Sequence, residues 1–270
     1  MNSAGRPRAR RSWLTMIVAA FAIVGVCLLG MWRPWSAVSP PDAGGTDAPQ
    51  TVAAPALLAL PETPRVLLFG DSWVYGSAAT VPTEGFAYVL SDRLGWDAVI
   101  DGVRGSGYLK PGIDGGSYGE RVAALDPALD PDLVILEGSI NDRRLYPDGY
   151  RDAVTAAWDD LAALYPDARI VILGPAPQVL PVERPTARID EVLRELAQAR
   201  GWWYVSPIAE DWITEVNYLD VIDTGEIGRN HPSSNGHAYL ADRLGEALEV
   251  IRDDTTVVAE APPAADSLAP

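Results

Sequence analysis

The chain has 270 residues, of which 48% are hydrophobic and 21% are charged, a balance that supports one domain of moderate size with appended segments. The net charge is -16, and the basic side chains are unevenly placed, because five of the 21 lie within residues 1–33, which contain no acidic residue. The rest of the chain carries all 37 acidic side chains and would repel phosphate backbones, so nucleic acid is excluded as a partner. The single cysteine, Cys27, excludes an intrachain disulfide and a cysteine-based metal site.

The N-terminal region contains an uncharged stretch from Trp13 to Trp32, which is long enough to cross a bilayer as a helix. Arginines precede it, and they favour a cytoplasmic N-terminus with export of the remainder. We therefore expect a basic cytoplasmic segment at 1–11 and a transmembrane anchor at 12–32. A cleaved signal sequence is the alternative. A lipoprotein is disfavoured, because the residue before Cys27 is branched rather than small.

Residues 33–63 are rich in proline, alanine and glycine and show no periodicity, which predicts an extended linker. The segment 253–270 has a similar composition and is expected to be disordered. A single domain is predicted between them, over 64–252.

Within that domain, apolar runs alternate with segments of helical spacing. In chain order, the expected elements are a strand at 65–69, a helix at 84–94, strands at 97–100 and 132–136, a helix at 148–164, a strand at 169–173, a helix at 186–199, a strand at 202–205 and a helix at 236–252. This alternation indicates a doubly wound, flavodoxin-like α/β sandwich, with about five parallel strands and helices on both faces of the sheet.

Ligands of open α/β sheets bind beyond the carboxyl ends of the strands, so the residues there are the candidates for chemistry. Gly70-Asp71-Ser72 follows the first strand, a glycine-rich turn at Gly102–Gly107 follows the second, and Asn141-Asp142 follows the third. Each block by itself also fits a tight turn or a helix cap. His231, directly before the last helix, returns to the same edge and is the type of base that a catalytic serine requires.

These blocks, with the His231-Pro-x-x-x-Gly-His237 pattern, resemble those of the SGNH (GDSL-like) serine hydrolases over about residues 64–250. The resemblance implies an SGNH-type fold, with Ser72 as nucleophile and His231 as general base. It also implies an oxyanion hole formed by the amides of Ser72 and Gly105 and the side chain of Asn141. Gly107 is an alternative to Gly105 if the turn has a different register.

One position departs from the family pattern. The family usually has an aspartate three residues before the catalytic histidine, and here that position is Gly228. Asp220, Asp223 or Glu226 from the same loop are candidate orienting acids, and a backbone carbonyl that accepts from the imidazole is the alternative. We expect a Ser-His dyad or a displaced acid rather than an inactive protein.

Several other patterns are weighed beside these blocks. Ser117 lies in a G-x-S-x-G sequence, but a proline- and glycine-containing loop precedes it where a nucleophile elbow requires a strand. No zinc-ligand or Walker A spacing occurs, so no metal and no cofactor are expected. Trp73 and Tyr108 follow the candidate catalytic blocks and are expected to form a substrate wall.

The sequence therefore predicts a serine ester hydrolase, an esterase or deacylase, anchored in the cell membrane by one helix. Its catalytic domain would be extracytoplasmic, or secreted if the N-terminal segment is cleaved. Acylated glycans or lipid esters of the cell envelope are the expected substrates. An envelope O-acyltransferase is one alternative, and a non-catalytic glycan-binding or scaffold domain that retains the fold is another.

Overall fold

The structure, a computed structural model, describes residues 55 and 57–252. The predicted cytoplasmic segment, membrane anchor and C-terminal tail lie outside the described residues, as does most of the predicted linker. None of the described helices combines the length and the hydropathy that a membrane crossing requires.

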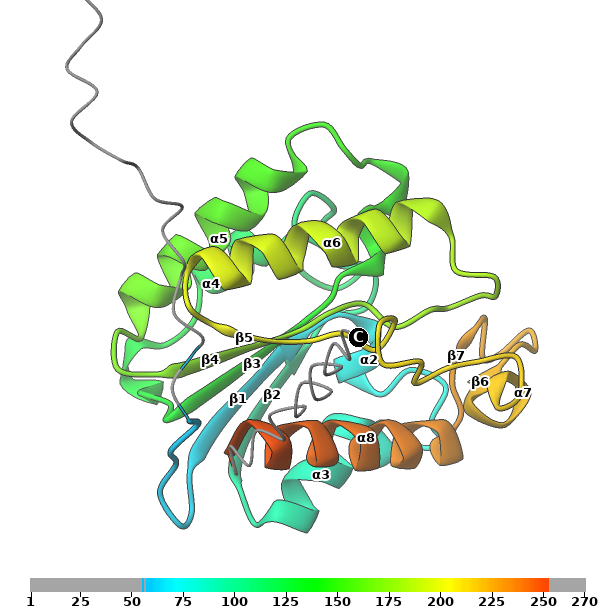
Figure 1. Cartoon of the computed structure of the whole chain (residues 1–270), viewed down its shortest axis with the longest axis horizontal. Helices are drawn as coiled ribbons and strands as arrows, with labels where there is room; N and C mark the ends of the chain where they lie inside the picture. Colours follow the sequence, from blue (N-terminus) through cyan, green and yellow to red (C-terminus); the bar gives the residue numbers. More distant parts are fainter. Residues whose placement is uncertain (1–54, 56, 253–270) are drawn as a thin grey trace, which may run out of the picture. The chain divides into compact units, whose positions relative to one another are not determined.

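The domain is built on a five-stranded sheet with the strand order β2-β1-β3-β4-β5 (Figure 1). All neighbouring strands are parallel. The strands are β1 (Arg65–Gly70), β2 (Asp97–Gly102), β3 (Leu133–Glu137), β4 (Arg169–Leu173) and β5 (Trp203–Val205). Because the strands are parallel, their carboxyl ends meet at one edge of the sheet, where ligands bind in such folds.

Helices cover both faces of the sheet (Figure 1). One face carries α3 (Phe86–Leu94) and α8 (Ser234–Arg252), and the other carries α4 (Tyr118–Val122), α5 (Tyr150–Leu164) and α6 (Arg184–Ala199). The short helices α2 (Ser72–Tyr75) and α7 (Tyr218–Val221) complete the described α-helices, with 3-10 turns at Pro82–Glu84, Pro127–Leu129 and Ile140–Arg144. The doubly wound α/β fold predicted from the sequence is confirmed.

The core consists of two apolar layers, one on each face of the sheet. Val66 and Leu68 of β1 pack on the side of α3 and α8. Leu67 and Phe69 pack on the opposite side, against α4, α5 and α6. Successive strand residues point to opposite faces, so a strand buried on both sides must be apolar at every position, which explains the unbroken apolar run of β1.

The structure also contains elements that the sequence did not predict. A small antiparallel pair joins β6 (Ile222–Asp223) to β7 (His231–Pro232), next to α7. These elements, like α2 and α4, are too short to produce a recognisable hydrophobic period. Both β7 and α2 carry candidate catalytic residues, so their formation is decided by tertiary contacts.

His237, the second histidine of the chain, is a structural residue at the start of α8. Its side chain is fully buried, its Nδ1 accepts from the backbone amide of Phe86 at 3.2 Å, and its Nε2 lies 3.0 Å from the carbonyl of Ser77. This arrangement requires the neutral ring with the proton on Nε2. Burial lowers the pKa of His237 to about 4, because a protonated ring would be desolvated and would oppose the Phe86 amide.

This buried histidine predicts a loss of stability in acid. Between about pH 6.5 and pH 4 the unfolded chain binds a proton at residue 237 and the folded chain does not, so the stabilisation present above pH 6.5 is lost as the pH falls. The contribution of this group is about 3 kcal/mol over that range. Urea unfolding of the wild type and of His237→Gln from pH 7 to pH 4 measures it. The variant should have the lower free energy of unfolding at pH 7. The free energies of unfolding of the two proteins, plotted against pH, should converge toward pH 4. Parallel curves would show that His237 does not titrate in this way.

Candidate active site

Ser72 occupies the first position of α2, directly after β1. The carboxylate of Asp71 caps this helix, with Oδ1 accepting from the amide of Trp73 at 2.9 Å. Helix α2 ends after one turn at Gly76, whose φ of 86° is a left-handed conformation that favours glycine. The strand and the capped turn therefore place the Ser72 side chain at the carboxyl edge of the sheet.

His231 lies beside Ser72, although 159 positions separate them in the sequence. Its Nε2 is 2.9 Å from Ser72 Oγ. The pairing of β7 with β6 holds the backbone of His231, and the ring is half-buried. This distance allows direct proton transfer from the serine hydroxyl to the imidazole.

The other ring nitrogen of His231 is held by the protein backbone. Nδ1 lies 2.8 Å from the carbonyl oxygen of Gly228. A carbonyl only accepts hydrogen bonds, so Nδ1 carries the proton and the lone pair of Nε2 faces Ser72. Of the orienting groups considered from the sequence, the backbone carbonyl is the one that contacts the imidazole, and it belongs to the residue that stands where the family has its aspartate.

The candidate orienting acids have other contacts. Asp223 Oδ1 accepts from the amide of Gly225 at 2.8 Å, and the side chain of Glu226 is exposed to solvent. Asp220 receives a hydrogen bond through its backbone carbonyl, from Ser233 Oγ. A Cβ atom on Gly228 would stand 2.2 Å from Asp223 Cγ, so this loop has no space for a side chain at position 228. The structure thus contradicts the prediction of Asp223 or Glu226 as the group that orients His231.

Two backbone amides are available to stabilise an oxyanion. Within the described part of the chain, the amides of Ser72 and Gly105 have no hydrogen-bond acceptor. The φ of Gly105 is 74°, a left-handed value that a residue with a Cβ rarely adopts, and this conformation shapes the turn after β2. The amide of Gly107, the alternative donor, is already bonded to the carbonyl of Lys110 at 2.8 Å. The geometry therefore favours Gly105 over Gly107.

The side chain of Asn141 reaches the same place from the end of β3. Its Nδ2 donates to Asp71 Oδ2 at 2.9 Å and lies 3.0 Å from the carbonyl of Ser106. An amide has two N–H groups, so Asn141 can donate to an oxyanion only by exchanging one of these bonds. The same Nδ2 also lies 3.1 Å from Ser139 Oγ.

Buried charges lie under this site. Asp71 is fully buried, and its Oδ2 also accepts from Ser139 Oγ at 2.9 Å. Burial raises the pKa of Asp71 and raises the pKa of Glu137 well above its usual range. The hydrogen bonds donated to Asp71 by Trp73 and Ser139 oppose this effect and favour its anion. The buried guanidinium of Arg121 donates to the carbonyl of Gly70 at 2.8 Å and adds an attractive positive charge.

Asp142 is a further residue of the site region, which the sequence places in the block after β3 without a role of its own. Its carboxylate accepts from the backbone amides of Tyr108, Leu109 and Lys110 at 2.7, 3.1 and 3.1 Å. These contacts hold the loop after Gly105 against the end of β3. Burial raises the pKa of Asp142 to about 6. The position of Asp142 directly after Asn141 is the feature of the sequence that indicates a role in the site.

Ser72 and His231 open into a groove of about 1000 Å³, which also borders Gly105 and Asn141. The predicted wall residues lie elsewhere: Trp73 is 3% exposed and Tyr108 is 4% exposed, and each belongs to the apolar core. The hydroxyl of Tyr108 accepts from Trp158 Nε1 at 2.8 Å. The prediction of Trp73 and Tyr108 as a substrate wall is therefore wrong, because both side chains point into the core.

Two further sequence expectations concern Ser117 and metals. Ser117 is the N-cap of α4, and its hydroxyl donates to the carboxylate of Glu120 in a capping box, so it is a helix-capping residue. Among residues 55 and 57–252, no group of three histidine, cysteine, aspartate or glutamate side chains is arranged to hold a metal ion.

Comparisons with known proteins agree with this geometry. Residues 68–239 match the model of the GDSL-like Lipase/Acylhydrolase family. The chain is 28% identical over 198 residues to GDSL lipase Rv0518 of Mycobacterium tuberculosis, an alignment that covers 68% of this chain and 81% of that lipase.

Solved structures show the same fold at lower identity. The aryl esterase of M. smegmatis superimposes with a TM-score of 0.52 at 17% identity, covering 69% of this chain and 99% of the esterase. Est24, a carbohydrate acetylesterase from Sinorhizobium meliloti, has a TM-score of 0.53 at 16% identity, with 69% and 99% covered. With the family model spanning more than half of the sequence, the chain belongs to the GDSL-like lipase/acylhydrolase (SGNH) family and is an esterase of that family.

Proposed function

We propose that this esterase cleaves its substrate through an acyl-enzyme on Ser72, with His231 as the general base. The observation that carries the proposal is the 2.9 Å contact between His231 Nε2 and Ser72 Oγ, with Nδ1 held by the Gly228 carbonyl. His231 removes the hydroxyl proton as Oγ attacks the ester carbonyl, and then gives this proton to the leaving alcohol. Water attacks the acyl-enzyme in a second round that uses the same base.

Negative charge develops on the carbonyl oxygen during each attack. The amides of Ser72 and Gly105 and the side chain of Asn141 are the donors for this oxygen. Fixed donors of this kind typically contribute about 3 kcal/mol each to lowering the barrier. The two amides need no rearrangement, whereas Asn141 exchanges its contact with Ser106 for the oxyanion.

The proposed location of the enzyme is outside the cytoplasmic membrane. Support comes from the uncharged stretch at 12–32, the basic residues of 1–11 and the linker composition of 33–63. At that location the ester would belong to an acylated glycan or a lipid of the cell envelope. One related protein is named a lipase and another a carbohydrate acetylesterase, and these names support an ester substrate of either kind.

The catalytic roles predict the effect of two substitutions. Ser72→Ala and His231→Ala in the full-length chain should each lower kcat/KM on p-nitrophenyl acetate and butyrate by about a thousandfold or more. Ser117→Ala is the matched control, since this serine lies in a nucleophile-like sequence but only caps α4, and its activity should stay at the wild-type level. A serine-directed fluorophosphonate should label the wild type and the control but not Ser72→Ala. Folded protein with neither hydrolysis nor labelling would refute the proposed mechanism.

The carbonyl contact of His231 makes a second prediction. Asp223→Asn and Glu226→Gln should each keep kcat/KM within about twofold of the wild type, because neither carboxylate contacts the imidazole. Gly228→Ala should lower activity strongly, since its methyl group would displace the Asp223 side chain and the loop that carries the carbonyl. A loss of about a hundredfold or more in either acid variant, with native circular dichroism, would identify an acid as the orienting group instead.

The proposed location is tested with a phosphatase reporter that is active only outside the cytoplasm. Fused after residue 63 in a bacterial host, it should be active, and replacing the four arginines of segment 1–11 by glutamate should lower that activity. Activity of a cytoplasm-only reporter at the same junction would contradict the proposed orientation.

A further inference from the structure

The groove at Ser72 is rich in positive charge, although the chain as a whole is acidic. Its lining contains five basic residues and one acidic residue: Arg104, Lys110, Arg143, Arg144, Arg229 and Glu226. In the whole chain, acidic residues outnumber basic ones by 37 to 21. Basic side chains thus outnumber acidic ones at the groove, whereas acidic side chains outnumber basic ones in the chain as a whole. The excess of positive charge at the groove attracts anions to the site.

Two of these basic side chains are already neutralised. Arg104 forms an ion pair with Asp114, and Arg143 forms one with Glu183 at 2.9 Å. By contrast, Lys110, Arg144 and Arg229 have no carboxylate within 4.0 Å among residues 55 and 57–252. These three side chains, which we call the groove cations, carry positive charge that the protein leaves uncompensated.

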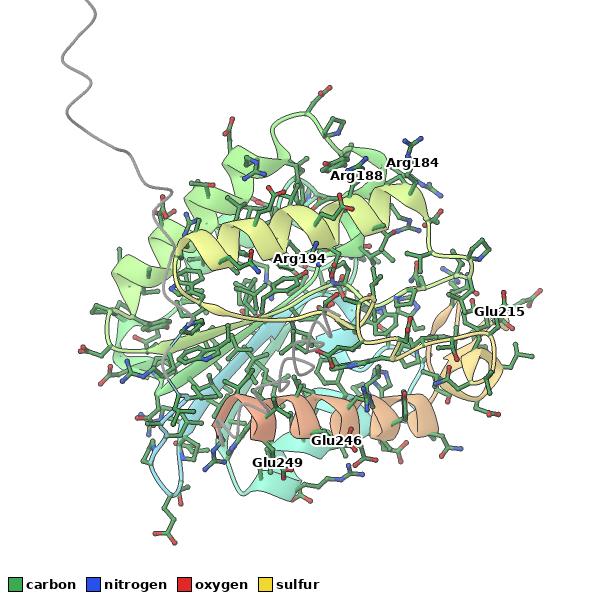
Figure 2. All side chains as sticks on the ribbon, viewed as in Figure 1. Arg184, Arg188, Arg194, Glu215, Glu246 and Glu249 are labelled. Carbon is green, nitrogen blue, oxygen red and sulfur yellow. The ribbon has the colours of Figure 1, made fainter. Side chains whose placement is uncertain are left out.

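Some arginines outside the groove are paired with a neighbouring carboxylate. Arg188 and Arg194 both belong to α6 (Figure 2). Arg188 lies 2.8 Å from Glu191, and Arg194 lies 3.9 Å from Asp190. Arg169, Arg184 and Arg252 also have no carboxylate within 4.0 Å in the described part of the chain. What distinguishes the groove cations is that they line the same groove as Ser72 and His231.

Lys110, the only lysine of the chain, lies beside the backbone of Gly105. Its Nζ is 3.7 Å from the position that a Cβ on Gly105 would occupy, next to the proposed oxyanion donor. The backbone at Lys110 is fixed, because its amide donates to Asp142 at 3.1 Å and its carbonyl accepts from Gly107 at 2.8 Å. A buried carboxylate therefore holds the loop that carries this ammonium group to the edge of the site.

We propose that the alcohol part of the ester substrate carries a negatively charged group, a phosphate or a carboxylate, that the groove cations bind. This inference rests on the proposed function, because it describes the substrate of the same Ser72 site. A hydrocarbon acyl chain offers these cations no charge to bind, so the cationic part of the groove suits the alcohol part. Arginine and lysine side chains bind phosphate and carboxylate through charge-assisted hydrogen bonds, which are stronger than neutral ones.

The test compares three esters that share an acetyl group and a three-carbon alcohol: acetylglycerol, acetylglycerol phosphate and acetylglycerate. Acetate release by the full-length chain gives kcat/KM for each. We expect kcat/KM to be about tenfold or more higher for an anionic ester than for acetylglycerol. This holds for both anionic esters if the groove binds either anion, and for one of them if the groove recognises only that anion. This preference should weaken as the ionic strength rises, because the groove is open to solvent. The two anionic esters distinguish recognition of phosphate from recognition of carboxylate.

Substitutions then assign the preference to the groove cations. Lys110→Gln and Arg144→Gln should each lower the ratio of anionic to neutral kcat/KM several-fold, and Lys110→Arg should retain most of it. Arg169→Gln is the matched control, since Arg169 is an exposed arginine at the opposite end of the sheet, at the start of β4. It removes the same charge and should leave the ratio unchanged. An equal change of the ratio in Arg169→Gln would show a general charge effect and overturn the proposal.

The outcomes separate this inference from the proposed function. Hydrolysis of acetylglycerol that depends on Ser72, without a preference for either anionic ester, would overturn the anionic substrate and leave the esterase mechanism intact. Absence of hydrolysis together with absence of fluorophosphonate labelling at Ser72 would refute the mechanism and the inference with it. If the fluorophosphonate labels Ser72 but none of these short esters is hydrolysed, the rate of labelling becomes the readout. Glycerol 3-phosphate or glycerate should then slow labelling more than glycerol does. Equal slowing of labelling by all three compounds would overturn the proposal.

Discussion

The site depends on one buried carboxylate, that of Asp71. It caps the helix that begins at Ser72, and it also accepts hydrogen bonds from Ser139 and Asn141 at the end of a different strand. It therefore joins Ser72, the proposed nucleophile after β1, to Asn141, the proposed oxyanion donor after β3. Burying a charge is costly, and here the hydrogen-bond donors and the nearby Arg121 offset that cost. Polar groups in this core are retained because they position the chemistry.

The orientation of His231 shows how a catalytic arrangement persists when one of its usual members is absent. A carbonyl fixes the tautomer of the imidazole as a carboxylate would, because both only accept hydrogen bonds. It differs in carrying a partial charge instead of a full one, and it stabilises the imidazolium less during proton transfer. The backbone contact with Gly228 therefore preserves geometry and tautomer, at some loss of electrostatic support.

The charges around the groove connect the fold to substrate choice. Asp142 holds the backbone of the loop after β2, and this loop places both the Gly105 amide and the Lys110 ammonium beside Ser72. Positive charge is thus concentrated at the groove where we propose that the ester binds, whereas the chain as a whole is strongly acidic. A field of this kind favours an anionic ligand both in diffusion toward the groove and in binding within it.

The sequence by itself determined the sheet, the helices that cover it, and the pair Ser72 and His231. Unbroken apolar runs identify doubly buried strands, and the blocks at their ends resemble those of a known family. Only the tertiary structure decided that the Gly228 carbonyl orients His231, because the direction of a carbonyl depends on the backbone angles of its loop, including the left-handed Arg229 and Asn230. It also decided that Trp73 and Tyr108 lie in the core, and that Lys110, Arg144 and Arg229 share one groove. Residue type and spacing do not encode these facts, because they arise from contacts between segments far apart in the chain.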